Sequence, residues 1–135
     1  MANYIVFDPE NYLTIEPLED GLIASLSDND CMYCIDGGNW ESLSAGKNTP
    51  AINIGQTISF KGYLKPNSEK GIGTFSINKM CNLKGNCMSL LYGDNCNFYD
   101  SCVEYCFCGL FKNCSTICEV SNNFLPATTV AWYCY

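Results

Sequence analysis

Short runs in which apolar and polar residues alternate occupy most of the first two thirds of the chain. An alternation with a period of two is typical of strands that bury one face. Turn-forming residues separate the runs, as at Asp20-Gly21 and at residues 36–39 (Asp-Gly-Gly-Asn). Strands that recur about every ten residues predict an antiparallel β-sandwich of the immunoglobulin-like type. The runs lie at residues 12–16, 22–26, 32–35, 51–54, 57–60 and 74–77.

The turns also predict which strands are partners. Asp20-Gly21 is expected to join residues 12–16 to residues 22–26 as a hairpin. The turn at residues 36–39 is expected to join residues 32–35 to a strand that opens at Trp40. Residues 74–77 form the last clear alternating run, and nothing before residue 86 has a helical period.

The last third of the chain repeats a short pattern. Residues 105–107 (Tyr-Cys-Phe) and 133–135 (Tyr-Cys-Tyr) are similar, and Cys106 and Cys134 are 28 residues apart. A fixed period of about 20–50 residues indicates a solenoid of stacked repeats. Because one unit cannot bury its apolar stripe alone, the pattern predicts either a longer array or an end covered by another subunit.

Two segments of this region resemble a known repeat family. Residues 110–117 read L-F-K-N-C-S-T-I and residues 124–135 read F-L-P-A-T-T-V-A-W-Y-C-Y. Together they resemble the BspA-like leucine-rich repeat of gut Bacteroidetes proteins, most specifically in L-P-A-T-T. Ile117 and Val130 stand where that family uses Leu, a change that an apolar core tolerates.

The earlier part of the chain resembles the β-domain that often precedes such repeats. The residues that carry this resemblance are C-I-D-G-G-N-W-E-S-L, I-G-Q-T-I-S-F-K-G and N-L-K-G-N-C-M-S-L-L-Y-G-D-N. The two resemblances imply a mainly β protein, in which an N-terminal β-sandwich is followed by the start of a leucine-rich-repeat solenoid.

Three parts are therefore expected along the chain. Residues 1–10 are predicted to form an anchor strand, residues 11–86 a β-sandwich domain, and residues 87–135 the first leucine-rich-repeat unit or units, continuing beyond residue 135. The apolar run at residues 88–92 is expected to cap the first repeat. The anchor contains four apolar or aromatic residues that favour addition as an edge strand to a partner's sheet: Tyr4, Ile5, Val6 and Phe7.

Charge argues against two classes of partner. The net charge is −7, with seven lysines and no arginine, so the chain lacks the basic patch expected for nucleic acid or for anionic membrane surfaces. Only 16% of the residues are charged and 47% are hydrophobic. This composition favours an assembly in which a partner covers part of the apolar surface. We therefore expect a homo-oligomer or a larger complex.

Catalytic chemistry has little support in the sequence. Histidine is absent, which removes Ser-His and Cys-His activation and histidine metal ligation. Asp28 with Asp30, or Asp94 with Asp100, could form a glycosidase-like pair, and the loop from Asp94 to Asp100 could also hold calcium. Neither follows a known motif spacing, so solvated loop charges are preferred. No enzyme activity and no cofactor are predicted.

The eleven cysteines leave several interpretations open. Cys31 and Cys34 have metal-ligand spacing, yet residues three apart in a strand point to opposite faces. Buried packing is preferred over a disulfide, and both over zinc. Six aromatic residues could form a carbohydrate or protein contact surface, although most are expected in the core: Trp40, Tyr63, Tyr92, Tyr99, Tyr133 and Tyr135.

These observations predict a non-enzymatic structural or adhesion protein. Proteins that resemble this combination occur as Bacteroidetes surface adhesins and in the virions of their crAss-like phages. Residues 1–10 do not resemble a signal peptide, so we expect a virion component made in the host cytoplasm: a head or tail fibre, or a capsid decoration protein. Its partners would be other virion proteins, itself, and host-surface glycan or protein. The alternative is a bacterial cell-surface adhesin fragment.

Overall fold

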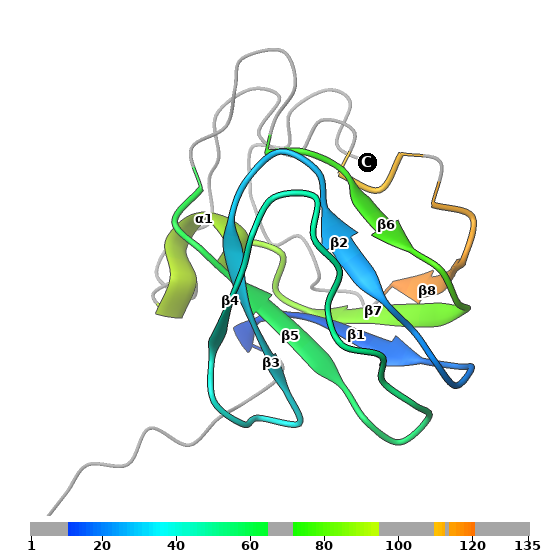
Figure 1. The fold of residues 1–135 in the computed structure, drawn as a ribbon. Helices are drawn as coiled ribbons and strands as arrows, with labels where there is room; N and C mark the ends of the chain where they lie inside the picture. The colour runs from blue at the N-terminus through cyan, green and yellow to red at the C-terminus, as the bar shows by residue number, and fades with distance from the viewer. Residues whose placement is uncertain (1–10, 65–71, 95–109, 113, 121–135) are drawn as a thin grey trace, which may run out of the picture.

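The structure is a computed structural model that describes residues 11–64, 72–94, 110–112 and 114–120. The described part is mainly β, with a six-stranded mixed sheet and a two-stranded sheet (Figure 1). The order in the large sheet is β4-β3-β5-β1-β7-β8, and β2 pairs with β6. The strands are β1 (Leu13–Pro17), β2 (Ala24–Leu26), β3 (Cys31–Ile35), β4 (Glu41–Leu43), β5 (Ile58–Lys61), β6 (Phe75–Ile77), β7 (Cys81–Gly85) and β8 (Ile117–Val120).

Strand β1 lies inside the large sheet, between β5 and β7. Leu13 is opposite Phe60 on one side and Gly85 on the other. Every neighbouring pair in this sheet is antiparallel except β7 and β8, which are parallel. A short helix, α1 (Ser89–Tyr92), follows β7 and contacts β5.

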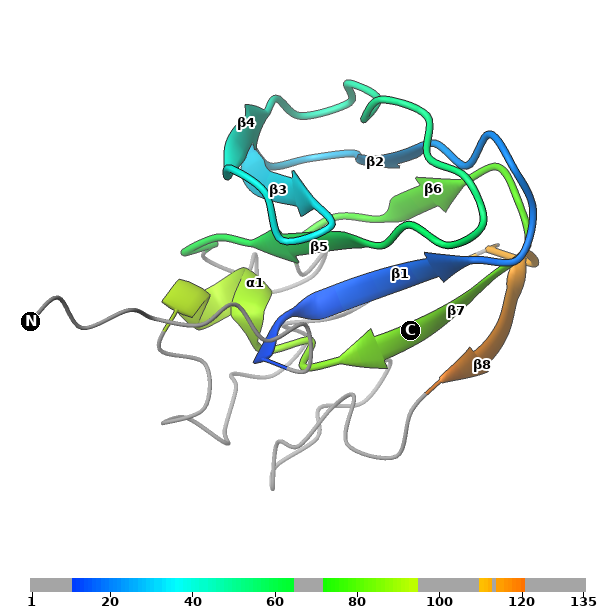
Figure 2. The same ribbon diagram turned by 90° about the horizontal axis from the view of Figure 1, so that it is seen from below.

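The core lies between the two sheets. Figure 1 shows the β2–β6 pair above β1, β5 and β7, and Figure 2 gives the same elements from below. Alternate residues of each strand enter this core because successive side chains point to opposite faces. Leu13 and Ile15 of β1 therefore share one buried cluster with Phe60 of β5 and Phe75 of β6.

Several predicted strands are confirmed and three predicted details are wrong. The hairpin of β3 and β4 forms as expected, through residues 36–40. Asp36 (φ 53°) and Gly37 (φ 71°) are both left-handed, as the centre of a primed turn requires, and the Gly38 N–H closes this turn on the Ile35 carbonyl at 3.0 Å. Trp40 precedes β4 instead of opening it. The hairpin predicted between residues 12–16 and 22–26 does not form, because β2 pairs with β6 in the other sheet.

The third wrong detail is the strand predicted at residues 51–54, which contribute only an isolated bridge from Ile52 to Leu22. The structure also adds elements that the sequence pattern did not reveal. Strand β7 alternates buried and half-buried residues, although it follows residues 74–77, the last clear alternating run in the sequence. The apolar run at residues 88–92 contains the helix α1.

Residues on both sides of the expected domain boundary at residue 86 share the core. Leu110 and Phe111 are buried in the same cluster as Phe75, and the Phe75 N–H donates to the Leu110 carbonyl at 2.7 Å. Strand β8 extends the large sheet beside β7. The predicted anchor residues Tyr4, Ile5, Val6 and Phe7 and the L-P-A-T-T element lie outside the described residues.

Candidate contact surface

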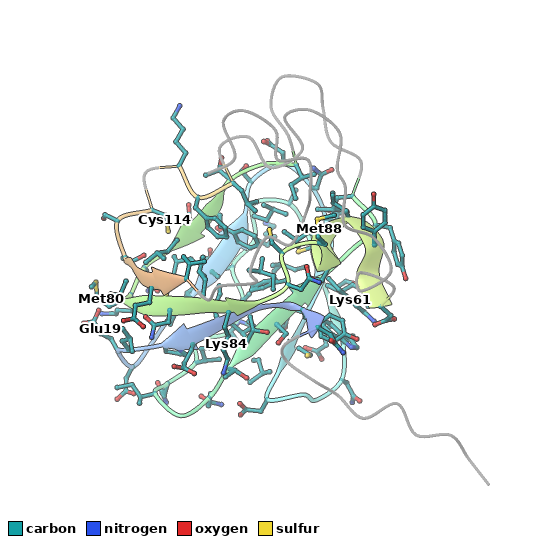
Figure 3. All side chains as sticks on the ribbon, turned by 180° about the vertical axis from the view of Figure 1, so that it is seen from behind. Glu19, Lys61, Met80, Lys84, Met88 and Cys114 are labelled. Atoms are coloured by element: carbon teal, nitrogen blue, oxygen red, sulfur yellow. The ribbon has the colours of Figure 1, made fainter. Side chains whose placement is uncertain are left out.

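Lys61 and Asp94 form an ion pair where the large sheet meets the end of α1. Lys61 ends β5, and Asp94 follows the helix after one glycine. The Lys61 Nζ atom lies 3.0 Å from each oxygen of the Asp94 carboxylate. The Tyr12 hydroxyl donates to Asp94 Oδ1 at 2.7 Å. Figure 3 shows Lys61 beside α1, on the side opposite Met80 and Glu19.

Aromatic rings surround this ion pair. The Lys61 Nζ atom lies 4.4 Å from the centre of the Trp40 ring, within the range of a cation–π contact. The Trp40 and Tyr12 rings are 4.9 Å apart and tilted by 58°. Tyr12 just precedes β1 and Trp40 just precedes β4, so residues far apart in sequence converge on one lysine.

Tyr63 contributes an exposed ring to the same place. The backbone on both sides of it is held by α1, because Gly62 N–H donates to the Ser89 carbonyl and Leu64 N–H to the Leu90 carbonyl, both at 3.0 Å. A Cβ added to Gly93 would lie 2.5 Å from Tyr63 Cζ, so the ring end rests on this glycine. Tyr63 nevertheless remains 65% exposed. We define Tyr12, Trp40, Lys61, Tyr63 and Asp94 as the Lys61 cluster.

Electrostatics keep the Asp94 carboxylate ionised. Partial burial opposes ionisation, but the hydrogen bonds from Tyr12 and Lys61 and the Lys61 charge outweigh it, so the pKa of Asp94 is below its ordinary value. A carboxyl with a lowered pKa is a poor proton donor at neutral pH. At neutral pH this carboxylate therefore acts as a charged hydrogen-bond acceptor.

Replacing Asp94 by Asn should destabilise the protein at neutral pH and matter less in acid. A group whose pKa is lowered by folding contributes stability above its unfolded pKa, about 3.9, and that contribution disappears as pH falls through the folded pKa. The melting temperatures of wild type and Asp94→Asn should therefore differ at pH 7 and converge below about pH 4. The exposed Asp28, changed to Asn, is the control. A difference in melting temperature that stays constant from pH 7 to pH 3 would contradict the lowered pKa of Asp94.

A second surface feature is a shallow groove on the β2–β6 sheet. Its volume is about 240 Å³ and its lining contains no charged side chain. Asn78 is held in place, because its Oδ1 accepts from Ile23 N–H at 2.7 Å. The remaining lining residues are Ser25, Asn48, Ser76 and Ile77.

The described cysteines are free thiols, and four are buried: Cys31, Cys34, Cys81 and Cys87. Burial raises the pKa of Cys31 and of Cys81 to about 12 and that of Cys34 to about 11. Cys31 joins the core, whereas Cys34 lies on the opposite face of β3 beside Ser59. The separation predicted for this pair is confirmed, and the two thiols pack as small apolar groups.

Native-state alkylation should distinguish these thiols. With iodoacetamide at pH 8, Cys118, which is exposed, should react fully, while the buried Cys31, Cys34 and Cys81 should react only after denaturation. Peptide mass spectrometry of native and urea-treated samples measures each site. Rapid native labelling of Cys34 would show that its face of β3 is open to solvent.

Two of the carboxylates that were considered as a glycosidase-like pair or a calcium site have other partners in the part of the chain that is described. Asp30 Oδ1 accepts from Ala45 N–H at 2.7 Å and so supports a turn. The Asp94 carboxylate is already bound by an ammonium, and Asp100 lies outside the described residues. Among residues 11–64, 72–94, 110–112 and 114–120, no three cysteine, aspartate or glutamate side chains gather as metal ligands.

Sequence reasoning named three members of the Lys61 cluster, in two unrelated roles, and missed two. Trp40 and Tyr63 are among the candidate contact aromatics, and the structure places Trp40 beside the Lys61 ammonium and Tyr63 against Gly93, next to Asp94 in the chain. In the sequence, Asp94 is considered only with Asp100, as a carboxylate pair or calcium loop, Tyr12 lies in the first predicted strand, and Lys61, which follows the run at residues 57–60, has no predicted role. Of the other four candidate aromatics, Tyr92 ends α1 and packs half-buried against the core, and those at positions 99, 133 and 135 lie outside the described residues.

No family model, curated protein or solved structure matches this chain. The described helices are all too short or too polar to cross a membrane. By its fold, the described part of the chain belongs to the mainly β class, with a mixed six-stranded sheet.

Proposed function

We propose that this chain is a non-enzymatic structural and attachment protein of a phage virion, either a head or tail fibre or a capsid decoration protein. The N-terminal part, including residues 4–7, would hold it to capsid or tail proteins, and its surfaces would contact the host. The resemblance to BspA-like proteins supports the virion setting. The finer architecture that we propose is an immunoglobulin-like sandwich followed by a leucine-rich-repeat array.

The Lys61 cluster is the observation that carries the attachment role. Its lysine and aspartate neutralise each other at 3.0 Å, and its exposed Tyr63 is held by backbone hydrogen bonds on both sides. Aromatic side chains that are fixed before binding lose little entropy when a partner covers them. A rigid aromatic surface without a free charge is suited to contact with a partner.

Two further features support an assembly. Leu18 and Met80, which are 42% and 39% exposed, are neighbours because Leu18 N–H donates to the Met80 carbonyl at 2.8 Å. Figure 3 shows Met80 far from Lys61, so this apolar pair offers a second contact surface. The parallel strand β8 at the sheet edge is the kind of addition that a stacked repeat makes.

The proposal is tested by locating the protein in its natural source. Purified phage particles should contain it at a fixed copy number by quantitative mass spectrometry, and antibodies should label the particle surface in electron micrographs. Sedimentation of the isolated chain at micromolar concentration should show an oligomer. Recovery only from the bacterial surface fraction would favour the adhesin alternative, and recovery from neither fraction would refute an attachment role.

A further inference from the structure

The exposed ring of Tyr63 lies against Gly93, and the next residue, Asp94, carries an acceptor that still has binding capacity. An ionised carboxylate offers about four acceptor positions. In Asp94 one is used by the Tyr12 hydroxyl and two by Lys61. The Asp94 side chain remains 53% exposed, so the unused position on Oδ2 is accessible to a hydroxyl donor from solvent.

The charges at this place select against ionic ligands. An anionic ligand would be repelled by Asp94 and by the net charge of −7. A cationic ligand would meet the Lys61 ammonium, which already lies 3.0 Å from both carboxylate oxygens. The ligand that fits is uncharged, donates hydroxyl hydrogen bonds, and has an apolar face for the ring.

We propose that the Lys61 cluster binds a neutral pyranose sugar, with the Tyr63 ring against the C–H face of the sugar and Asp94 Oδ2 accepting from a sugar hydroxyl. The electron-rich face of an aromatic ring attracts weakly positive C–H groups. A hydrogen bond to an ionised acceptor is stronger than one to a neutral acceptor. Gly62, Leu64 and Gly93 hold the ring before the sugar arrives, so binding requires little reordering. This assignment rests on the proposed attachment function and names its ligand class.

The direct test measures binding of two glycans that share a core and differ in charge. N-acetyllactosamine is the neutral probe and its sialylated form is the anionic probe, both titrated into the full chain and followed by NMR and on a multivalent glycan array. The neutral probe should bind at millimolar strength and at least tenfold better than the sialylated one. Equal or stronger binding of the sialylated probe would overturn the charge argument and the assignment.

Variants then locate the site. Tyr63→Ala should weaken binding of the neutral probe at least tenfold, whereas Tyr63→Phe, which keeps the ring, should stay within about threefold. Asp94→Asn should weaken binding about three- to tenfold because it removes the charge from the acceptor. Ile54→Ala is the matched control, since Ile54 is similarly exposed at 61% and its N–H donates to Asp20, which follows the end of β1 opposite to Tyr12. Binding that survives Tyr63→Ala, or falls equally in Ile54→Ala, would refute the site.

A cell-binding assay separates the ligand class from the attachment function. If wild-type protein binds host cells, Tyr63→Ala does not, and N-acetyllactosamine competes, the sugar assignment holds. If binding depends on Tyr63 but neither the neutral nor the sialylated glycan competes, the surface contacts a protein and the sugar assignment fails while attachment stands. If cell binding is unaffected by Tyr63→Ala, both fail at this site.

Discussion

Replacing Phe75 by Ala is expected to lower the free energy of unfolding by about 3–5 kcal/mol. Phe75 is fully buried in β6. Its ring lies 5.1 Å from that of Phe60 in the large sheet and 5.7 Å from that of Phe111. Loss of this ring leaves a cavity that three segments of the chain line together. Urea unfolding measures the change.

The neighbouring residue provides the control for this prediction. Ser76 is exposed on the opposite face of β6, and Ser76→Ala should change the free energy of unfolding by no more than about 0.5 kcal/mol. Equal effects of the two substitutions would mean that β6 does not pack as the structure shows.

Phe111 extends this test to the region that was expected to belong to the repeat array. The Phe75 and Phe111 rings are nearly parallel, with an interplanar angle of 14°, and such pairs contribute about 0.5–1.5 kcal/mol beyond their burial. A double-mutant cycle of the two Ala variants should therefore show coupling of that size within one cooperative transition. A separate transition that responds only to Phe111→Ala would place residues 110–111 in an independent unit.

Replacing Ser89 by Ala is expected to have the second large effect, although only one oxygen atom is lost. Ser89 is fully buried at the start of α1. Its Oγ accepts from Leu13 N–H at 2.9 Å and donates to the Phe60 carbonyl at 2.7 Å. Ser89→Ala leaves both backbone groups without this partner, at a cost of about 1–3 kcal/mol each.

The exposed Ser42 of β4 is the matched control for Ser89. Ser42→Ala should alter the free energy of unfolding by less than about 0.5 kcal/mol. Hydrogen exchange of the Leu13 amide gives a second measurement, because this amide should exchange faster in Ser89→Ala. An unchanged stability together with unchanged exchange would show that water or another group replaces the hydroxyl.

The position of most strands could be predicted because alternation reports burial of one face directly. The run at residues 32–35 became β3, and Asp36-Gly37 supplied the left-handed turn into β4. Partner choice was less predictable. Strand β2 has the same alternation as any other half-buried strand, so nothing local distinguishes β6 from β1 as its neighbour.

The candidate contact surface could be predicted only in part, because its residues are far apart in the sequence and come together only in the folded chain. Lys61 and Asp94 are 33 positions apart, and no spacing rule connects a strand end to the residue after a helix. Gly93 gives no sequence signal of its own, yet its missing side chain makes room for the Tyr63 ring.

By itself, the sequence determined the mainly β class, the β3–β4 hairpin and the burial of Cys31 and Cys34 on opposite faces, because a two-residue period and turn chemistry are local properties of the backbone. The tertiary structure alone decided that β2 belongs to a second sheet, that Ser89 bridges β1 and β5, and that Tyr63 stands beside a paired Asp94. These outcomes depend on which buried surfaces meet when the sheets pack. That choice is made by the free energy of the whole core, and no short segment encodes it.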